Sequence, residues 1–242
     1  MSLSGDVAVN FWLNLDEGYK SSDNYILFTV NGQTQKVTVG KAANGTNGAK
    51  IFACGVAAKE MTDTISAQFY LVDGTAVGSP YTYTVRDYAD YILTHDSYSK
   101  EAKNLVKAML NYGACSQKYF KYRTDDLANS EISLKLYFKD VDMEGMEFKQ
   151  YFYPITVTKQ GGYTIVTIEN ISALWINSGV RVDVWKDGSY YDYVEYCPER
   201  YCKLILNQPT SEVYNVDLKR VVSSLYLYNL AAHEYAAKAN QI

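Results

Sequence analysis

Apolar and polar residues alternate along much of the first 85 residues, a pattern that predicts half-buried β-strands. In the first run, Val7, Val9, Phe11 and Leu13 share one face of the expected strand. The later runs are residues 25–39, 51–56, 65–72 and 81–85. Because turn residues separate these runs at regular spacing, we expect about six short strands in an antiparallel sheet or sandwich.

Two-residue turns support this assignment. Asn31-Gly32 divides the run at 25–39 into two strands, because both residues tolerate the positive φ angles of a tight hairpin. In the second half, Gly161-Gly162 and Asp187-Gly188 predict similar turns. The strands expected beside them are residues 151–158, 163–168, 180–185 and 190–196.

The hydrophobic period changes after residue 85. Apolar residues between Ala102 and Phe120 form one stripe of an amphipathic helix, with Ser99 placed to cap its first turn. A shorter helix is expected at 86–94. We expect these two helices to form a hairpin whose apolar stripe covers the sheet of its own half.

The second half of the chain repeats the ending of the first. The segments Tyr88–Leu93 and Leu105–Tyr112 correspond to Tyr201–Leu206 and Val221–Tyr228. The offset is 113 residues at the first helix (201 − 88) and 116 at the second (221 − 105). A nearly constant offset predicts two tandem copies of one fold.

We therefore predict an α+β fold of two tandem repeats, each an antiparallel β-sheet or sandwich followed by a helical hairpin of one short and one long helix. The first repeat covers residues 1–122, with its β-rich part at 4–85 and its hairpin at 86–122. A polar linker is expected at 123–130. The second repeat covers residues 131–242, with its β-rich part at 131–197 and its hairpin at 198–240.

Composition narrows the function classes. The net charge of −4 argues against a nucleic-acid partner, which would require a basic stripe. No apolar run approaches the roughly 18 residues of a membrane-spanning helix, so we expect no membrane insertion. Cys115 and Cys202 align with alanines of the other copy, which indicates small buried side chains. Cys197 and Cys202 could still close a short loop in an exported protein.

The sequence predicts no enzyme, no metal site and no cofactor. His95 and His233 are the only histidines and lie in different copies, so no nucleophile–base system is indicated. We expect His95 at the surface and His233 on a helix face. Asp140–Gly145 resembles the start of a calcium loop, but Tyr151 stands where a bidentate glutamate is required, so we interpret it as a solvated turn.

Tyrosine provides the best binding candidates. The chain has 24 Tyr against 8 Phe, and tyrosine suits contact surfaces because one end is apolar and the other polar. Strand alternation places Tyr191 and Tyr193 on one face, and Tyr190 and Tyr196 on the other. An alternative is that these rings lie under the helical hairpin. The candidate binding residues are Tyr151, Tyr153, Tyr190, Tyr191, Tyr193 and Tyr196; Trp12, Trp175 and Trp185 are assigned to core or strand packing.

The segments Tyr83–Leu93, Leu105–Ala114 and Gln117–Phe120, with the opening Leu3–Phe11, resemble repeat modules in large exported proteins of gut Gram-positive bacteria. The resemblance covers the first copy and the helical hairpin of the second. It implies an extracellular or cell-wall location, a non-catalytic role and further domains of a larger parent chain as neighbours. Some large proteins of this kind bind immunoglobulin variable domains as superantigen-like proteins.

The leading hypothesis is a non-catalytic extracellular binding or adhesion module of a bacterial surface protein. Its partner would be a host protein, with immunoglobulin as one class, or a glycan. One alternative is a structural spacer that presents another domain. A second is an accessory domain of a carbohydrate-active enzyme, which a concave cleft lined by tryptophan with acids beside it would favour.

Overall fold

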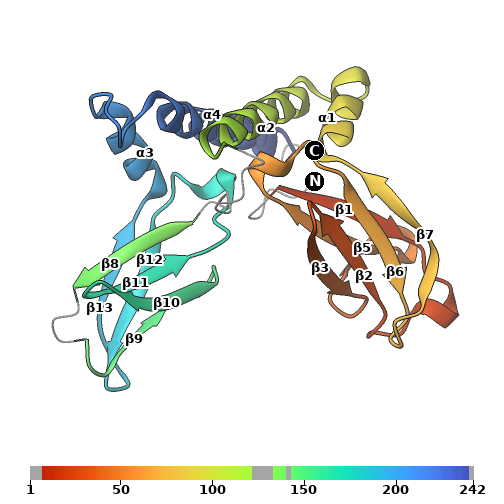
Figure 1. Cartoon of the computed structure of the whole chain (residues 1–242), viewed down its shortest axis with the longest axis horizontal. Helices are drawn as coiled ribbons and strands as arrows, with labels where there is room; N and C mark the ends of the chain where they lie inside the picture. The colour runs from red at the N-terminus through yellow and green to blue at the C-terminus, as the bar shows by residue number, and fades with distance from the viewer. Residues whose placement is uncertain (1–6, 122–132, 140–142, 240–242) are drawn as a thin grey trace. The chain divides into compact units, whose positions relative to one another are not determined.

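The computed structural model describes residues 7–121, 133–139 and 143–239. In this part of the chain the fold is α+β, with antiparallel sheets and four α-helices (Figure 1). The chain divides into two compact units, unit 1 (Val7–Gln117) and unit 2 (Lys118–Ile242). The linker predicted at 123–130 and residues 140–142 of the calcium-like turn lie outside the described residues.

Unit 1 contains two antiparallel sheets. In the first, the strand order is β1-β5-β4, with β1 at Val7–Leu13, β5 at Lys50–Val56 and β4 at Ala43–Asn44. In the second, the order is β3-β2-β6-β7, with bounds of Gln33–Thr38, Tyr25–Val30, Ile65–Tyr70 and Ala76–Tyr83. Short 3-10 helices lie at η1 (Glu17–Tyr19), η2 (Thr46–Gly48) and η3 (Ala58–Glu60).

Buried side chains from both sheets form the core of unit 1. Phe28 and Phe52 are fully buried, and the Phe11 ring lies 5.1 Å from the Phe28 ring between centroids. Asn31 and Gly32 have φ angles of 47° and 77° and join β2 to β3, which confirms the predicted hairpin turn.

The two helices of unit 1 begin at side-chain caps. Helix α1 (Val85–Thr94) starts with a capping box in which Thr84 and Asp87 each accept a hydrogen bond from the other's backbone N–H. Helix α2 (Lys100–Tyr119) starts at Ser99, whose Oγ accepts from the Ala102 N–H at 3.2 Å. The predicted Ser99 cap is therefore confirmed.

The hairpin of unit 1 packs at one end of the sheets, on η3 and the residues after it (Figure 1), and not over a sheet face as the sequence had suggested. The α2 backbone approaches η3 so closely that a Cβ added to Gly113 would lie 2.9 Å from the Ala58 carbonyl oxygen. Gln117 Nε2 donates to the Lys59 carbonyl at 2.9 Å and to Thr62 Oγ1 at 3.0 Å. Gly113 and Gln117 explain why the hairpin does not cover a sheet face, because together they hold α2 against the η3 connection.

Ser116 on α2 offers a test of this packing. It is fully buried, and its hydroxyl has no hydrogen-bond partner among the described residues. Because an unsatisfied buried hydroxyl destabilises a fold, we expect Ser116→Ala to raise the free energy of unfolding by about 1 kcal/mol. Urea unfolding followed by circular dichroism measures this change, with Ala114→Ser on the exposed face as the control. A destabilised Ser116→Ala protein would show that the hydroxyl has a stabilising partner.

Unit 2 also contains two antiparallel sheets. In the first, the order is β10-β11-β8, with bounds of Ile155–Gln160, Tyr163–Ile168 and Leu134–Lys139. In the second, the order is β13-β12-β9, with bounds of Ser189–Tyr196, Val180–Lys186 and Met146–Lys149. The turns Gly161-Gly162 and Asp187-Gly188 have positive φ angles and confirm the two predicted hairpins.

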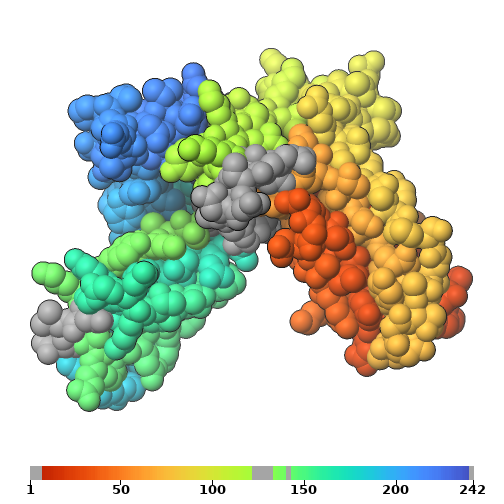
Figure 2. Space-filling view, viewed as in Figure 1, coloured from red at the N-terminus to blue at the C-terminus, as the bar shows by residue number. Residues whose placement is uncertain are grey.

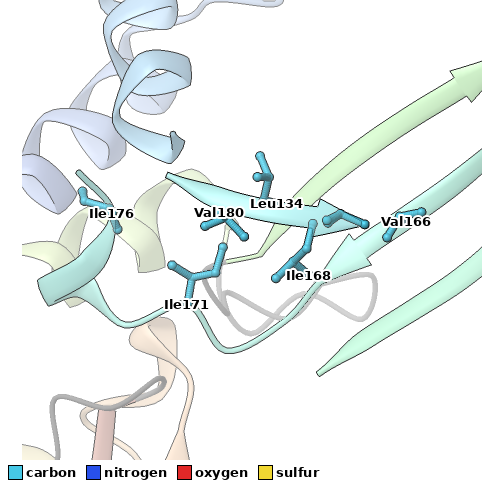
Figure 3. Close-up of a cluster of buried hydrophobic side chains, with 7 residues drawn as sticks. Leu134, Val166, Ile168, Ile171, Ile176 and Val180 are labelled. Carbon is cyan, nitrogen blue, oxygen red and sulfur yellow. The ribbon is translucent and has the colours of Figure 1, made fainter. Parts of the chain in front are cut away.

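A cluster of aliphatic side chains forms the core of unit 2 (Figure 3). It joins strands of both sheets through Val166, Ile168 and Val180, and it extends to Ile176 beside η4 (Ala173–Trp175). Phe138 and Phe148, one from each sheet, pack on this cluster with their ring centroids 4.9 Å apart. The inner faces of the two sheets of unit 2 are therefore in contact.

The helices of unit 2 are α3 (Pro198–Asn207) and α4 (Val216–Ala239), which pack together through Cys202, Ile205 and Val222. Asn215 caps the start of helix α4, because its Oδ1 accepts from the Leu218 N–H at 2.9 Å. No described helix is long and apolar enough to cross a membrane.

Helix α4 is tied to η4 by polar side chains. Asn229 is buried, and its Nδ2 donates to the carbonyls of Ala173 at 2.7 Å and Leu174 at 3.1 Å. One turn later, His233 Nε2 lies 3.3 Å from Asn177 Oδ1. The helical hairpin of unit 2 is thus also anchored to the connection between its sheets.

Candidate functional site

An arginine on the outer face of β12 organises the best candidate site. Arg181 Nε donates to Asp183 Oδ1 at 2.6 Å, its guanidinium lies 4.2 Å above the Tyr193 ring, and its Nη2 is 3.5 Å from the Tyr190 hydroxyl. The hydrogen bond to Asp183 raises the pKa of the guanidinium above its usual value, so the group stays charged. Ion pair and ring contact together restrict the side chain, and its other N–H groups stay available to a ligand.

A β-bulge places the two tyrosines on this arginine. Strand pairing shifts between Val184 and Trp185, so Trp185 pairs with Tyr190 and Val184 with Asp192, and Tyr191 has no paired residue on β12. Strict alternation had placed Tyr190 and Tyr193 on opposite faces. That expectation is wrong, because the extra residue in the bulge moves Tyr190 onto the outer face.

A hollow of about 590 Å³ adjoins Arg181 and Asp183. Exposed aromatic side chains line it: Phe152 is 87 % exposed, Tyr151 67 % and Trp175 49 %. We call these three residues, with Arg181, Tyr190 and Tyr193, the aromatic surface of unit 2. The alternative that the tyrosines lie under the helical hairpin is disfavoured, because about half of the surface of Tyr190 and of Tyr193 is exposed.

The segment that carries Tyr151 is not a strand, contrary to the prediction for 151–158. Gln150 Oε1 accepts from the backbone N–H groups of Phe152 and Tyr153 at 2.5 and 2.6 Å, which bends the chain before Pro154, and β10 begins only at Ile155. Proline lacks the N–H that a strand would donate, so residue 154 pairs only through its carbonyl, which accepts from the Glu169 N–H at 2.9 Å. The bend turns Phe152 outward, a position that alternation could not predict.

Two of the six predicted tyrosines support the core instead. Tyr153 and Tyr196 are partly buried and pack against the cluster of Figure 3. Burial raises the pKa of the Tyr153 hydroxyl above its usual value, so it stays protonated at neutral pH. Tyr191 is 62 % exposed and stands beside the surface. Arg181 therefore contacts Tyr190 and Tyr193, Tyr151 lines the hollow that Arg181 adjoins, and Tyr153 and Tyr196 pack against the core.

Core or strand packing is the expectation for the tryptophans; Trp12 of β1 does pack its ring against Gly45 beside β4, whereas Trp175 lies in η4 and outside the core. Trp12 is 55 % exposed, and Trp175 lines the hollow from η4. Trp185 is only partly exposed and carries Lys149 Nζ 3.9 Å above its ring. Lys149 also pairs with Glu147 at 3.7 Å, so charged side chains border the aromatic surface along β9.

Arg181, Asp183 and Phe152 are members of the site that sequence reasoning missed. Arg181 and Asp183 were visible only as polar positions in an alternating strand. A signal was present, since the segment Val180–Lys186 spaces Arg and Asp two residues apart and therefore on one face. Glu195 lies beside them: a Cβ added to Gly179 at the rim of the hollow would collide with its carboxylate.

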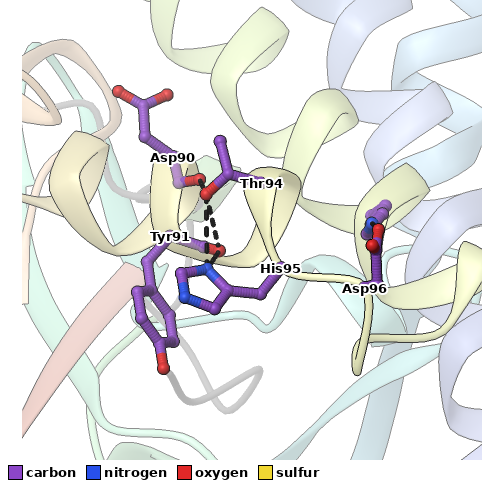
Figure 4. Close-up of polar contacts among 6 residues, drawn as sticks. Asp90, Tyr91, Thr94, His95 and Asp96 are labelled. Carbon is purple, nitrogen blue, oxygen red and sulfur yellow. Dashed lines mark hydrogen bonds and ion pairs between the residues drawn. The ribbon is translucent and has the colours of Figure 1, made fainter.

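The histidines and cysteines of the described chain serve structural contacts. His95 is exposed at the end of α1, where its Nδ1 lies 2.7 Å from the Tyr91 carbonyl and its ring stacks on Tyr91 (Figure 4). The four cysteines are free thiols, and burial raises the pKa of Cys54 to about 12 and of Cys202 to about 11. Among the described residues, no three His, Cys, Asp or Glu side chains gather as metal ligands would.

No protein-family model matches this chain, and no curated protein matches it in sequence.

Proposed function

We propose that this chain is a non-catalytic binding module of a bacterial surface protein, and that it recognises its partner through the aromatic surface of unit 2. The observation that carries the proposal is the set of exposed rings around one restrained arginine. Tryptophan, tyrosine and arginine dominate the energetics of protein interfaces, and rigid side chains lose little entropy on binding. A host protein is the favoured partner.

The same proposal includes an extracellular or cell-wall location, as the resemblance to exported repeat modules implies. The antibody heavy-chain framework is the first protein class to test. Exposed rings around a charged centre suit such a partner, because hot-spot residues cluster near the middle of an interface and a polar rim surrounds them. Lys149, Glu147 and Glu195 would supply that rim.

The test is a binding screen of the purified chain against immunoglobulins, mucin glycoproteins and a glycan array. We expect saturable binding to an immunoglobulin, weakened about tenfold or more by Phe152→Ala and by Tyr193→Ala. Phe152 is almost fully exposed, so its truncation leaves the fold intact.

Tyr137→Ala is the matched control. Tyr137 is a tyrosine of unit 2 whose exposure of 61 % lies between those of Tyr193 and Phe152; it is on β8 and outside the aromatic surface, so its loss should change the affinity less than twofold. Equal effects of Phe152→Ala and Tyr137→Ala would place the contact elsewhere. The absence of binding to all three panels would overturn the proposal of a binding module and favour a structural spacer.

A glycan is the second candidate partner, and the concave hollow beside Trp175 favours it. Its exposed rings offer apolar platforms, and Arg181 and Asp183 offer hydrogen-bonding groups next to them. This arrangement would suit an accessory domain of a carbohydrate-active enzyme. Binding on the glycan array alone, lost in Trp175→Ala, would favour this candidate over a protein partner.

We further propose that units 1 and 2 are tandem repeats of one sandwich. Their strand orders support this, since β1-β5-β4 parallels β8-β11-β10, and β2-β6-β7 parallels β9-β12-β13. Contacts at the sheet–helix connection also recur at offsets of 113 to 116 residues. The Arg86 N–H donates to the Met61 carbonyl in unit 1, and the Glu199 N–H donates to the Ile176 carbonyl in unit 2. The contact of Gln117 with Thr62 corresponds to that of His233 with Asn177. Gly113 lies beside Ala58, and Asn229 lies beside Ala173.

A further inference from the structure

Unit 1 contains a second hollow, different in kind from the aromatic surface of unit 2. It has a volume of about 910 Å³ and runs between β1 and the inner faces of β6 and β7. The space-filling view shows the red strands from the start of the chain and the yellow strands that precede α1 side by side in unit 1 (Figure 2). We call this hollow the β1 groove.

The backbone edge of β1 forms one wall of the groove. All seven residues of β1 line it, from both faces of the strand, which requires that the edge of the strand faces the hollow. Among the described residues, β1 pairs only with β5, so its other edge has no strand partner there. In an antiparallel strand, alternate residues direct both N–H and C=O toward that free edge.

The floor of the groove is one face of β7. Every second residue of that strand contributes to the lining, namely Val77, Ser79, Tyr81 and Tyr83. Ala67 and Phe69 of β6 continue the same face. A strand placed beside β1 would therefore lay its inward side chains on an existing apolar surface.

The free edge of β1 differs from the edges formed by β7 and β8. The β7 edge contains Pro80, and its pairing with β6 is irregular between Ala67 and Phe69, which are two devices that prevent edge pairing. The edge strand β8 of unit 2 carries Lys135 and Lys139. In contrast, β1 has no charge and no proline along seven residues, so it is suited to accept another strand.

We propose that the β1 groove binds an extended segment of a partner protein, which adds as a strand to the edge of β1. The seven residues of β1 set its length at about 23 Å. None of the residues that line the groove is charged, so the inward residues of the segment are apolar and uncharged. Backbone hydrogen bonds to β1 provide affinity, and the contacting rings of Phe11, Tyr81 and Tyr83, which line the groove, select the inward side chains. This inference rests on unit 1 alone and is independent of the function proposed for unit 2.

The probe is a capped heptapeptide of alternating threonine and valine, added to the full chain. Hydrogen exchange measured by NMR should show at least tenfold slower exchange at alternate β1 amides, those directed away from β5. The remaining β1 amides already bond to β5 and should change little. The same peptide with N-methyl groups on all of its backbone amides, which removes the donors on both edges, should protect none of them.

Two lysine variants of β7 locate the peptide. Ser79→Lys places a charge on the floor of the groove and should weaken peptide binding at least tenfold. Thr82→Lys lies on the exposed opposite face of the same strand, outside the lining, and should change binding less than twofold. Equal melting temperatures of the two variants establish that both are folded.

Three results would overturn the proposal. The first is unchanged exchange of the β1 amides at saturating peptide, and the second is equal binding by the Ser79→Lys and Thr82→Lys proteins. The third is protection of the same amides that rises with protein concentration in the absence of peptide, since the occupant would then be a second copy of this chain.

Discussion

Gly113→Asn is expected to destabilise unit 1 by about 2 kcal/mol, although asparagine occupies the position that we propose to be equivalent in unit 2. A Cβ at residue 113 would lie 2.8 Å from Met61 Sδ and 2.9 Å from the Ala58 carbonyl oxygen. The methionine can move, but the backbone carbonyl cannot move without displacing η3 or α2. Overpacking of this kind typically costs about 1–3 kcal/mol, which exceeds the gain in helix propensity.

The measurement is urea unfolding of unit 1, followed by the fluorescence of Trp12. Trp175 and Trp185 are replaced by phenylalanine in all variants, which leaves Trp12 as the only tryptophan. Ala114→Asn is the control, because residue 114 is the exposed neighbour on α2 and its substitution costs only about 0.5 kcal/mol of helix propensity. A Gly113→Asn protein as stable as the control would mean that η3 and α2 can separate without loss.

The reciprocal contact in unit 2 explains why the two positions differ. Asn229 donates two side-chain hydrogen bonds to backbone carbonyls of η4, so the amide side chain separates the backbone of α4 from that of η4. In unit 1 the backbone of α2 at Gly113 lies directly against η3, and the amide that bonds to η3 comes from Gln117, one turn later. At the two positions that we propose to be equivalent, the contact between helix and connection is thus made by a small residue in unit 1 and by a hydrogen-bonding residue in unit 2.

Local signals in the sequence predicted the local structure well. Hairpin turns depend on residues that tolerate positive φ, and Asn31-Gly32 and Gly161-Gly162 adopt it. Helix starts depend on caps, and Ser99 accepts the hydrogen bond that its position implied. Such features are decided within a few residues, so a single sequence contains the information.

Features that depend on distant residues were not predictable in this way. The outward position of Tyr190 follows from a bulge opposite Trp185, and a bulge breaks the period of two on which the face assignment relied. The exposure of Phe152 follows from the bend that Gln150 makes. The packing of the helical hairpin at the ends of the sheets depends on Gly113 and Gln117 meeting the η3 connection 50 to 60 residues earlier.

Cys54 is expected to make the stability of unit 1 fall with rising pH above about 9. The thiol is buried in β5, and burial raises its pKa from 9.0 to about 12. Between these values the unfolded chain releases the thiol proton and the folded chain keeps it. Since the unfolded state then binds fewer protons, the free energy of unfolding decreases with pH, by about 1.4 kcal/mol per unit.

Comparison with Cys54→Ala isolates this effect from the tyrosines and lysines that titrate in the same range. Both proteins carry Trp175→Phe and Trp185→Phe, so that Trp12 is the only tryptophan. The free energy of unfolding of the protein with Cys54, minus that of the protein with Cys54→Ala, should shrink by about 2 kcal/mol between pH 8.5 and pH 10.5. Trp12 fluorescence in urea again reports unit 1, so the second buried thiol, Cys202 of unit 2, does not contribute. A constant difference across this range would show that Cys54 ionises as easily in the folded protein as in the unfolded chain, and that β5 does not exclude water from it.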